Sequence, residues 1–348
     1  MKENRQTNIE VLRVFSMFLI VVMHYIFYGL KHNPGHIYYD VNTLMGMTNY
    51  LTMEPLYLLS QVAVNCYVMI TGYFLINKIQ YRWGGVLRVI VQTFFYSLLF
   101  LLSILILKGQ VSNIQLQKSI FPIHQWGYWF VTVYMGLLLV APLLSRIAIS
   151  LSKRQYQIVL FILFILNFQY LYGSVYAGHR TIMFFSFLFL LAGYLKIYGI
   201  NPQILKIKRM MFLGIWVLLT ILATLVNIKK GQFELIGTSY DGPILFLSIA
   251  TFIIFVTAKM EHPIFRFIAK LSPFTFGVYL IHTNCFINSG LWSLVPEKYN
   301  NPIFIHCIFF CLLIFILCTI ADFVRSIIFR VFSVDKLLDK ISDKIPQL

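Results

Sequence analysis

The sequence predicts an all-α, polytopic integral membrane protein with about ten transmembrane helices and both termini in the cytoplasm. Of its 348 residues, 59% are hydrophobic and only 11% are charged, a balance that soluble domains of this size do not show. Apolar runs of about twenty residues, long enough to cross the hydrocarbon core as helices, recur along the chain. The runs are continuous rather than alternating, which excludes a transmembrane β-barrel.

The apolar runs define ten predicted membrane spans. They cover residues 9–30, 55–77, 86–107, 126–148, 156–173, 180–199, 210–228, 242–259, 271–292 and 302–330. Because this number is even, both termini fall on one side of the membrane. We expect residues 1–332 to form one transmembrane domain and residues 333–348 to form an amphipathic tail on the cytoplasmic surface.

The distribution of basic residues gives the orientation. With a cytoplasmic N-terminus, 21 of the 28 lysines and arginines fall on the cytoplasmic side and seven on the other. This bias accounts for most of the net charge of +16, so the charge does not indicate a nucleic-acid partner. The five cysteines form no CxxC pair and no metal-ligand spacing, so we expect no metal site.

The first span carries two ionisable residues, an arginine and a histidine, in the stretch RVFSMFLIVVMH. His24 follows Arg13 by eleven residues, which on a helix places the side chains roughly 20° apart in azimuth and about 16 Å apart along the axis. Both therefore face the same side of the helix. Ionisable residues within a membrane indicate a functional site, although Arg13 also fits a cation snorkelling at a helix end and His24 a buried structural histidine.

The arrangement of Arg13 and His24 in a first transmembrane helix resembles the membrane-bound acyltransferase-3 family, whose members O-acylate cell-surface glycans. Further stretches resemble the family pattern in the same order, so that the similarity covers nearly the whole chain. They are NCYVMITGYFLINK (65–78), YRWGGVLRVI (81–90), YWFVTVYMGLLLVAPLL (128–144), SFLFLLAGYL (186–195) and SPFTFGVYLIH (272–282).

The resemblance implies that an acetyl group is transferred from cytoplasmic acetyl-CoA to a hydroxyl of a cell-surface or lipid-linked polysaccharide. The reaction would take place at the bacterial cell membrane and would need no metal. Arg13, Arg82 and Arg88 would contact the donor phosphates, and polysaccharide-assembly machinery is an expected partner. His24 would act as a general base or carry the acyl group itself, and we favour the base. The family often has two basic residues four positions apart where this chain has Arg82 and Arg88, which leaves the role of this pair open.

Four further residues are candidates for contacts with substrate. His282 lies in one of the family-like stretches, and we expect it to line the site. His179 and Arg180 would contact the acceptor sugar, or form a polar loop cluster instead. Trp129, with its neighbours His124, Trp126 and Tyr128, would stack on a sugar ring or belong to an interfacial aromatic belt.

The residues by themselves are also compatible with two other functions. A transporter or flippase would use Arg13 and His24 as an anion site or a proton relay, but the chain shows no internal repeat and no paired broken helices. A glycan polymerase would commonly carry a large external loop, which this sequence lacks. Dependence on acetyl-CoA separates an acyltransferase from both.

Overall fold

A computed structural model describes residues 6–31, 43–78, 83–123, 127–167, 181–199, 242–296 and 303–345, with isolated residues between 214 and 225. In this part of the chain every regular element is a helix, and no strand occurs. Six of the described helical segments are long and apolar enough to cross a membrane. The prediction of an all-helical fold is therefore confirmed for the described residues, and the six apolar segments are consistent with a membrane protein. The count of ten spans and the cytoplasmic placement of the termini stay predictions.

The six long segments account for most of the predicted spans. They are α1 (Thr7–His24) with the π-helical turn η1 (Tyr25–Lys31), α2 (Leu44–Ser60) with α3 (Val62–Leu75), α4 (Gly84–Lys108), α6 (Trp129–Ser150), α12 (Pro263–Ala269) with η2 (Ser272–Phe274) and α13 (Thr275–His282), and α15 (Ile303–Val331). The other helices are α5 (Asn113–Ile120), α7 (Lys153–Asn167), α9 (Ile182–Tyr198), α11 (Gly242–Thr257), α14 (Asn288–Trp292) and α16 (Val334–Ser342). The predicted span 210–228 lies mostly outside the described residues.

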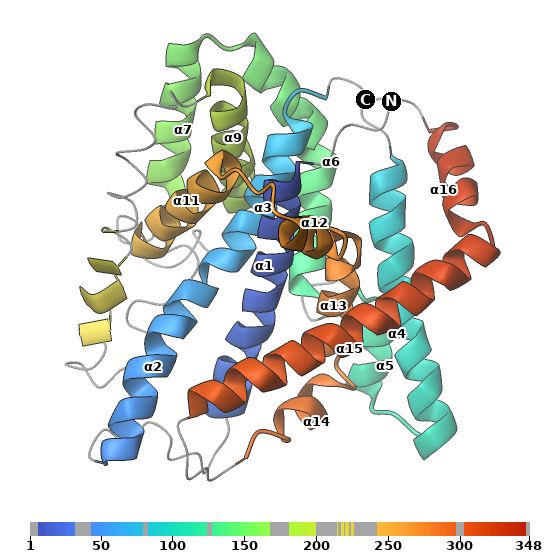
Figure 1. Cartoon of the computed structure of the whole chain (residues 1–348). Coiled ribbons are helices and arrows are strands. Elements are labelled where there is room, and N and C mark those ends of the chain that lie inside the picture. Colours follow the sequence, from blue (N-terminus) through green and yellow to red (C-terminus); the bar gives the residue numbers. More distant parts are fainter. Residues whose placement is uncertain are drawn as a thin grey trace.

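Helix α1 lies in the middle of the bundle (Figure 1). It packs against α2, α3, α11, α12, α13 and α15, and apolar side chains such as Ile9, Leu12 and Val21 are completely buried. A helix that is apolar on nearly every side is stable only inside a bundle, because each face needs an apolar neighbour. Side chains on α1 can therefore meet groups from several distant parts of the sequence.

Glycine allows α3 and α9 to pack at the level of their backbones. A Cβ atom on Gly72 would lie 2.3 Å from the carbonyl oxygen of Phe189, closer than any side chain tolerates. Small residues at helix contacts in membranes permit this close approach and increase the packing area. The contact fixes α3 relative to α9 on one side of α1.

The predicted span 271–292 is not one continuous helix, which corrects the expectation from hydropathy. Helix α13 ends at His282, and α14 begins only at Asn288. Two polar side chains bond to nearby backbone at this break: the Thr283 hydroxyl donates to Tyr279 O, and Asn284 Oδ1 accepts from the Phe286 amide. Such local bonds compete with helical hydrogen bonds and favour a turn, so His282 is placed at a helix end.

The C-terminal helix α16 folds back beside α4. It follows α15 after Ser333, whose φ of 53° lies in the left-handed region. Figure 1 shows α15 crossing the bundle obliquely and α16 standing next to α4. The amide of Gly84, the first residue of α4, donates to the Ser342 hydroxyl over 2.8 Å. The predicted tail is thus tied to the start of a membrane helix.

Candidate functional site

Two histidines that are distant in the sequence meet inside the bundle. His24 is the last residue of α1 and His282 the last residue of α13. Their ring nitrogens, Nδ1 of His24 and Nε2 of His282, lie 2.9 Å apart. His24 is only 9% exposed and His282 is fully buried. Two residues that were predicted separately, His24 and His282, are therefore in direct contact.

Hydrogen bonding determines which ring nitrogens carry protons when both imidazoles are neutral. His282 Nδ1 lies 2.6 Å from the carbonyl oxygen of Val278, which can only accept, so Nδ1 carries the proton. His282 Nε2 then accepts, and the proton between the rings belongs to His24 Nδ1. The other nitrogen of His24, Nε2, is left with a lone pair. The pair thus presents one nitrogen that can receive a proton.

Aromatic rings surround the histidine pair. The Trp292 ring centroid lies 6.5 Å from that of His24 and 6.4 Å from that of His282. On the His24 side, Tyr28 lies 5.5 Å away by the same measure. Tyr279 approaches the His282 ring edge-on at 6.2 Å. These rings enclose the buried pair and limit the orientations that both imidazoles can adopt.

The backbone changes from α-helix to π-helix immediately after His24. A π-helical turn inserts an extra residue, so the side chains beyond it point in new directions, and such turns occur frequently at functional sites. Here the turn contains Tyr25, whose hydroxyl lies 2.7 Å from Nδ1 of His306 on α15. The end of α1 is thus held by α13 through His24 and by α15 through Tyr25.

Arg13 lies near the other end of α1. Because α1 is a regular helix from residue 7 to residue 24, its side chain lies about 16 Å from that of His24 along the axis. The guanidinium forms an ion pair with Glu10, 2.9 Å between Nη1 and Oε2, and lies 5.9 Å from the centre of the Phe74 ring. It is paired but retains 26% of its side-chain exposure.

Arg88, on α4, is also paired with carboxylates. Its Nε lies 3.2 Å from Asp335 and its Nη2 lies 2.6 Å from Asp339, both on α16. All three side chains are exposed, Arg88 by 43%. Two carboxylates therefore occupy the positions on the guanidinium fork that phosphate oxygens would use.

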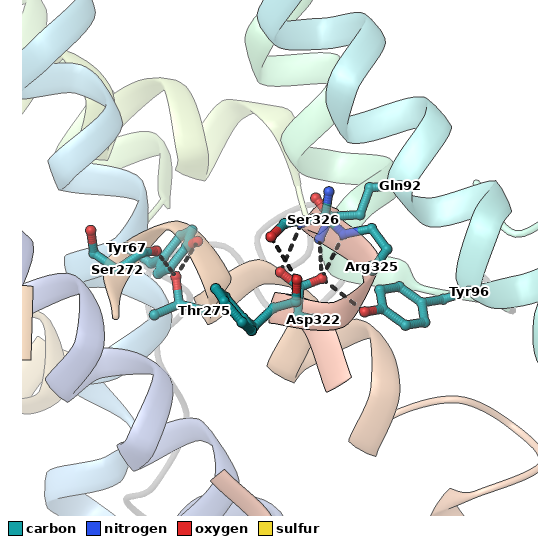
Figure 2. A network of polar contacts seen from close by, with 9 residues as sticks. Tyr67, Gln92, Tyr96, Ser272, Thr275, Asp322, Arg325 and Ser326 are labelled. Atoms are coloured by element: carbon teal, nitrogen blue, oxygen red, sulfur yellow. Dashed lines mark hydrogen bonds and ion pairs between the residues drawn. The ribbon is translucent and has the colours of Figure 1, made fainter. Parts of the chain in front are cut away.

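A second buried polar network lies between α4 and α15. Asp322 is fully buried, and Figure 2 shows Gln92, Tyr96 and Arg325 converging on it. Gln92 Nε2 and the Tyr96 hydroxyl donate to Oδ1 over 2.9 and 2.8 Å, and Arg325 donates to both oxygens over 2.9 and 2.8 Å. This network was not predicted from the sequence. Its signal was an acid and an arginine three residues apart in an otherwise apolar run.

A family model described as an acyltransferase domain matches residues 6–322. The chain belongs to the acyltransferase-3 family. This confirms the resemblance seen in the sequence motifs and makes the protein a membrane acyltransferase. The matched region contains both histidines and ends at Asp322, so that α16 lies beyond it. No curated protein and no solved structure matches the chain significantly.

The structure describes two more of the predicted aromatic residues of this acyltransferase, Tyr128 and Trp129. Trp129 begins α6, where its ring lies 6.0 Å from that of Phe130. Tyr128, predicted either to stack on a sugar or to belong to an interfacial aromatic belt, is buried, donates to Leu280 O and accepts from Asn284 Nδ2 on the chain around His282. The predicted residues outside the described part of the chain are Arg82, His124, Trp126, His179 and Arg180.

Metal-ligating side chains do not cluster in the described part of the acyltransferase. No group of three or more His, Cys, Asp or Glu residues is placed to hold a metal ion there. The two histidines of the pair bond to each other, and the lone pair that can take up a proton is on His24 Nε2. The site is therefore arranged for acid–base or nucleophilic chemistry by imidazole.

Proposed function

We propose that this acyltransferase moves an acetyl group from cytoplasmic acetyl-CoA to a hydroxyl of a cell-surface or lipid-linked polysaccharide. The observation that carries the proposal is the hydrogen bond between His24 and His282, which leaves His24 Nε2 proton-free at a buried site lined by aromatic rings. A proton-free imidazole nitrogen is the group that an alcohol needs in order to attack a thioester near neutral pH.

His24 acts as the general base in this proposal. Its Nε2 takes the proton of the acceptor hydroxyl while the oxygen bonds to the thioester carbon. The carbon–sulfur bond then breaks, and the CoA thiolate receives the proton from His24. His282 stays neutral and accepts the hydrogen bond from His24 Nδ1, which holds the ring in the required tautomer and stabilises the imidazolium formed. Such general base catalysis contributes about 10²–10⁴-fold in rate.

The arginines are proposed to bind the phosphates of the donor. Arg13, Arg82 and Arg88 belong to regions that the basic-residue bias places at the cytoplasmic side, where acetyl-CoA is available. Guanidinium groups match phosphate oxygens as bidentate donors. Arg13 and Arg88 are paired with carboxylates, so donor binding exchanges one anion for another and does not require burial of a new charge.

The acceptor is proposed to reach His24 from the outer half of the membrane. His24 ends α1, far from the residues near the N-terminus that are predicted to face the cytoplasm. A polysaccharide made by neighbouring assembly machinery in a bacterial cytoplasmic membrane would present its hydroxyls on that side. The acetyl group would thus cross the membrane through the protein, between the arginines and the histidine pair.

Inverted membrane vesicles provide the test of this function. Labelled acetyl-CoA is added outside vesicles that contain the protein and its native glycan, and label is measured in the polysaccharide fraction. We expect transfer by the wild type and at least tenfold weaker donor binding in Arg13→Ala. Movement of glycan without acetyl-CoA, and no transfer of label, would instead indicate a transporter or flippase.

A further inference from the structure

We propose that Asp322 is a positioning residue for the histidine pair: its carboxylate, clamped by α4 and α15, sets the place of α13 and thereby of His282. The effect on catalysis rests on the proposed function, whereas the positioning itself rests on packing geometry alone. Asp322 lies on α15 and has no contact with either imidazole, so that it acts through α13.

The carboxylate of Asp322 is held in one orientation. Arg325 binds both of its oxygens from one turn further along α15, and Gln92 and Tyr96 donate to Oδ1 from α4. Four hydrogen bonds to a fully buried carboxylate leave it no alternative rotamer, because any other orientation would leave buried donors without an acceptor. Asp322 is therefore a rigid point of contact.

Helix α13 rests directly on this point. A Cβ atom on Gly277 would lie 2.1 Å from Asp322 Cγ and 2.5 Å from Asp322 Cβ, so only glycine permits the observed approach. The neighbouring turn of α13 is also fixed, since the Thr275 hydroxyl donates to Ser272 O over 2.8 Å and lies 3.4 Å from the Tyr67 hydroxyl of α3 (Figure 2).

The position of Gly277 determines the position of His282. The two residues are five apart on one helix, which corresponds to about 7.5 Å along the axis and roughly 140° of rotation. One face of α13 therefore meets α15 while the other presents His282 to α1, in agreement with the contacts of α13 with both helices. A shift of α13 away from Asp322 changes the distance between His282 Nε2 and His24 Nδ1, which is 2.9 Å.

A gain in folding stability does not by itself explain why the polar network around Asp322 is present. Well-packed apolar side chains of similar volume often stabilise a protein as much as a buried ion pair does, because burying charges costs solvation. A carboxylate with four directed hydrogen bonds fixes one geometry, which apolar packing does not. Such a fixed geometry is what a two-histidine hydrogen bond at the end of α13 requires.

The test substitutes alanine for three helical glycines in the full-length protein. Gly277→Ala places a methyl group against Asp322. Gly72→Ala makes a comparable clash with the backbone of Phe189, away from α13, and Gly85→Ala adds a methyl where no atom lies within 4 Å. Each variant is compared for thermal unfolding, kcat, donor KM, and the ¹⁵N spectrum of its histidines, with the signals of His24 assigned from their loss in His24→Gln.

In the wild type we expect the ¹⁵N shifts of His24 to show a protonated Nδ1 and a bare Nε2. Gly277→Ala should shift them toward protonated Nε2 and lower kcat about 100-fold with donor KM unchanged. Gly72→Ala should lower only the unfolding temperature, and Gly85→Ala should match the wild type. Wild-type shifts in a folded Gly277→Ala protein would overturn the positioning role, whatever its activity.

Tyr96→Phe keeps the test possible if Gly277→Ala does not fold, because it removes one donor to Asp322 without adding volume. We expect the same spectral change in a smaller fraction of molecules and a several-fold lower kcat. An unchanged spectrum would again contradict the proposal. A changed spectrum with wild-type kcat would support the positioning and contradict the catalytic role of the pair, so the two proposals fail separately.

Discussion

The two ends of α1 differ in how their ionisable groups are held. At one end, His24 is buried and fixed by one hydrogen bond to a ring that is itself fixed by the backbone. At the other end, Arg13 remains partly exposed and pairs with Glu10 from its own helix. The histidine end is arranged in advance for a single geometry, whereas the arginine end can exchange partners.

The same contrast extends to α4. Its exposed start carries Arg88, whose ion pairs with Asp335 and Asp339 are exposed and are worth about 0–1 kcal/mol each. Further along, Gln92 and Tyr96 contribute to the buried network of Asp322. Leaving a buried polar group without its partner costs about 1–3 kcal/mol. The partly exposed arginines therefore suit the binding of a charged donor. The buried histidine end of α1 suits proton transfer.

Breaking the histidine pair should give the largest effect. His282→Met keeps the volume but offers His24 Nδ1 no good acceptor, so His24 is free to adopt the other tautomer. We expect kcat to fall about 10²–10³-fold, measured as acetyl transfer by purified protein in nanodiscs.

His282→Gln is the matched variant for this prediction, because its amide oxygen can accept where Nε2 does. It should recover about tenfold of the activity lost in His282→Met. Equal activities of the two variants would show that the hydrogen bond to His24 does not matter for turnover.

Arg88 of α4 should bind the donor more tightly once its two carboxylate partners are removed. The double variant Asp335→Asn with Asp339→Asn removes the two carboxylates that compete with donor phosphates. We expect donor KM to fall about threefold, because exposed ion pairs are individually weak, while kcat stays constant. Asp343→Asn, an exposed site on the same tail that does not contact Arg88, is the control.

An unchanged or higher donor KM in that double variant would indicate that Arg88 only anchors α16 and does not bind the donor. The salt dependence of KM gives a second measurement, since a phosphate contact at an exposed arginine weakens as ionic strength rises.

The smallest expected effect is at Tyr128, which joins α6 to the chain around His282. Tyr128→Phe leaves Leu280 O and Asn284 Nδ2 with one partner fewer, which should cost about 1–3 kcal/mol of folding free energy. Thermal unfolding in detergent should show a lower midpoint, with kcat changed by less than about threefold. A loss of activity as large as that of His282→Met would place Tyr128 in the catalytic site.

Hydropathy predicted the helical class of this protein because it acts locally along the chain. The spacing of Arg13 and His24 predicted one histidine, and the family-like stretch 272–282 predicted His282, but neither signal predicted their contact. The two residues lie 258 positions apart, and no local pattern specifies which helix ends meet. The break after His282 was also missed, since its apolar neighbours conceal Thr283 and Asn284 in an average over a window.

The partners of Arg88 and Asp322 show the same limit. The sequence indicated Arg88 as a basic residue near a membrane surface, yet its carboxylate partners come from the far end of the chain. Asp322 and Arg325 are visible as a pair at helical spacing, but Gln92 and Tyr96 belong to another helix. Tertiary packing brings these groups together, and a local sequence pattern shows only one side of each contact.

The most direct test of the account compares His24→Ala with His306→Ala in the acetyl transfer assay. Both remove a histidine near the end of α1, but His306 bonds to Tyr25 of η1 and is not a member of the His24–His282 pair. We predict that His24→Ala abolishes transfer while His306→Ala retains most of it, with equal amounts of folded protein. Equal transfer by His24→Ala and the wild type would contradict the central claim that His24 carries the chemistry.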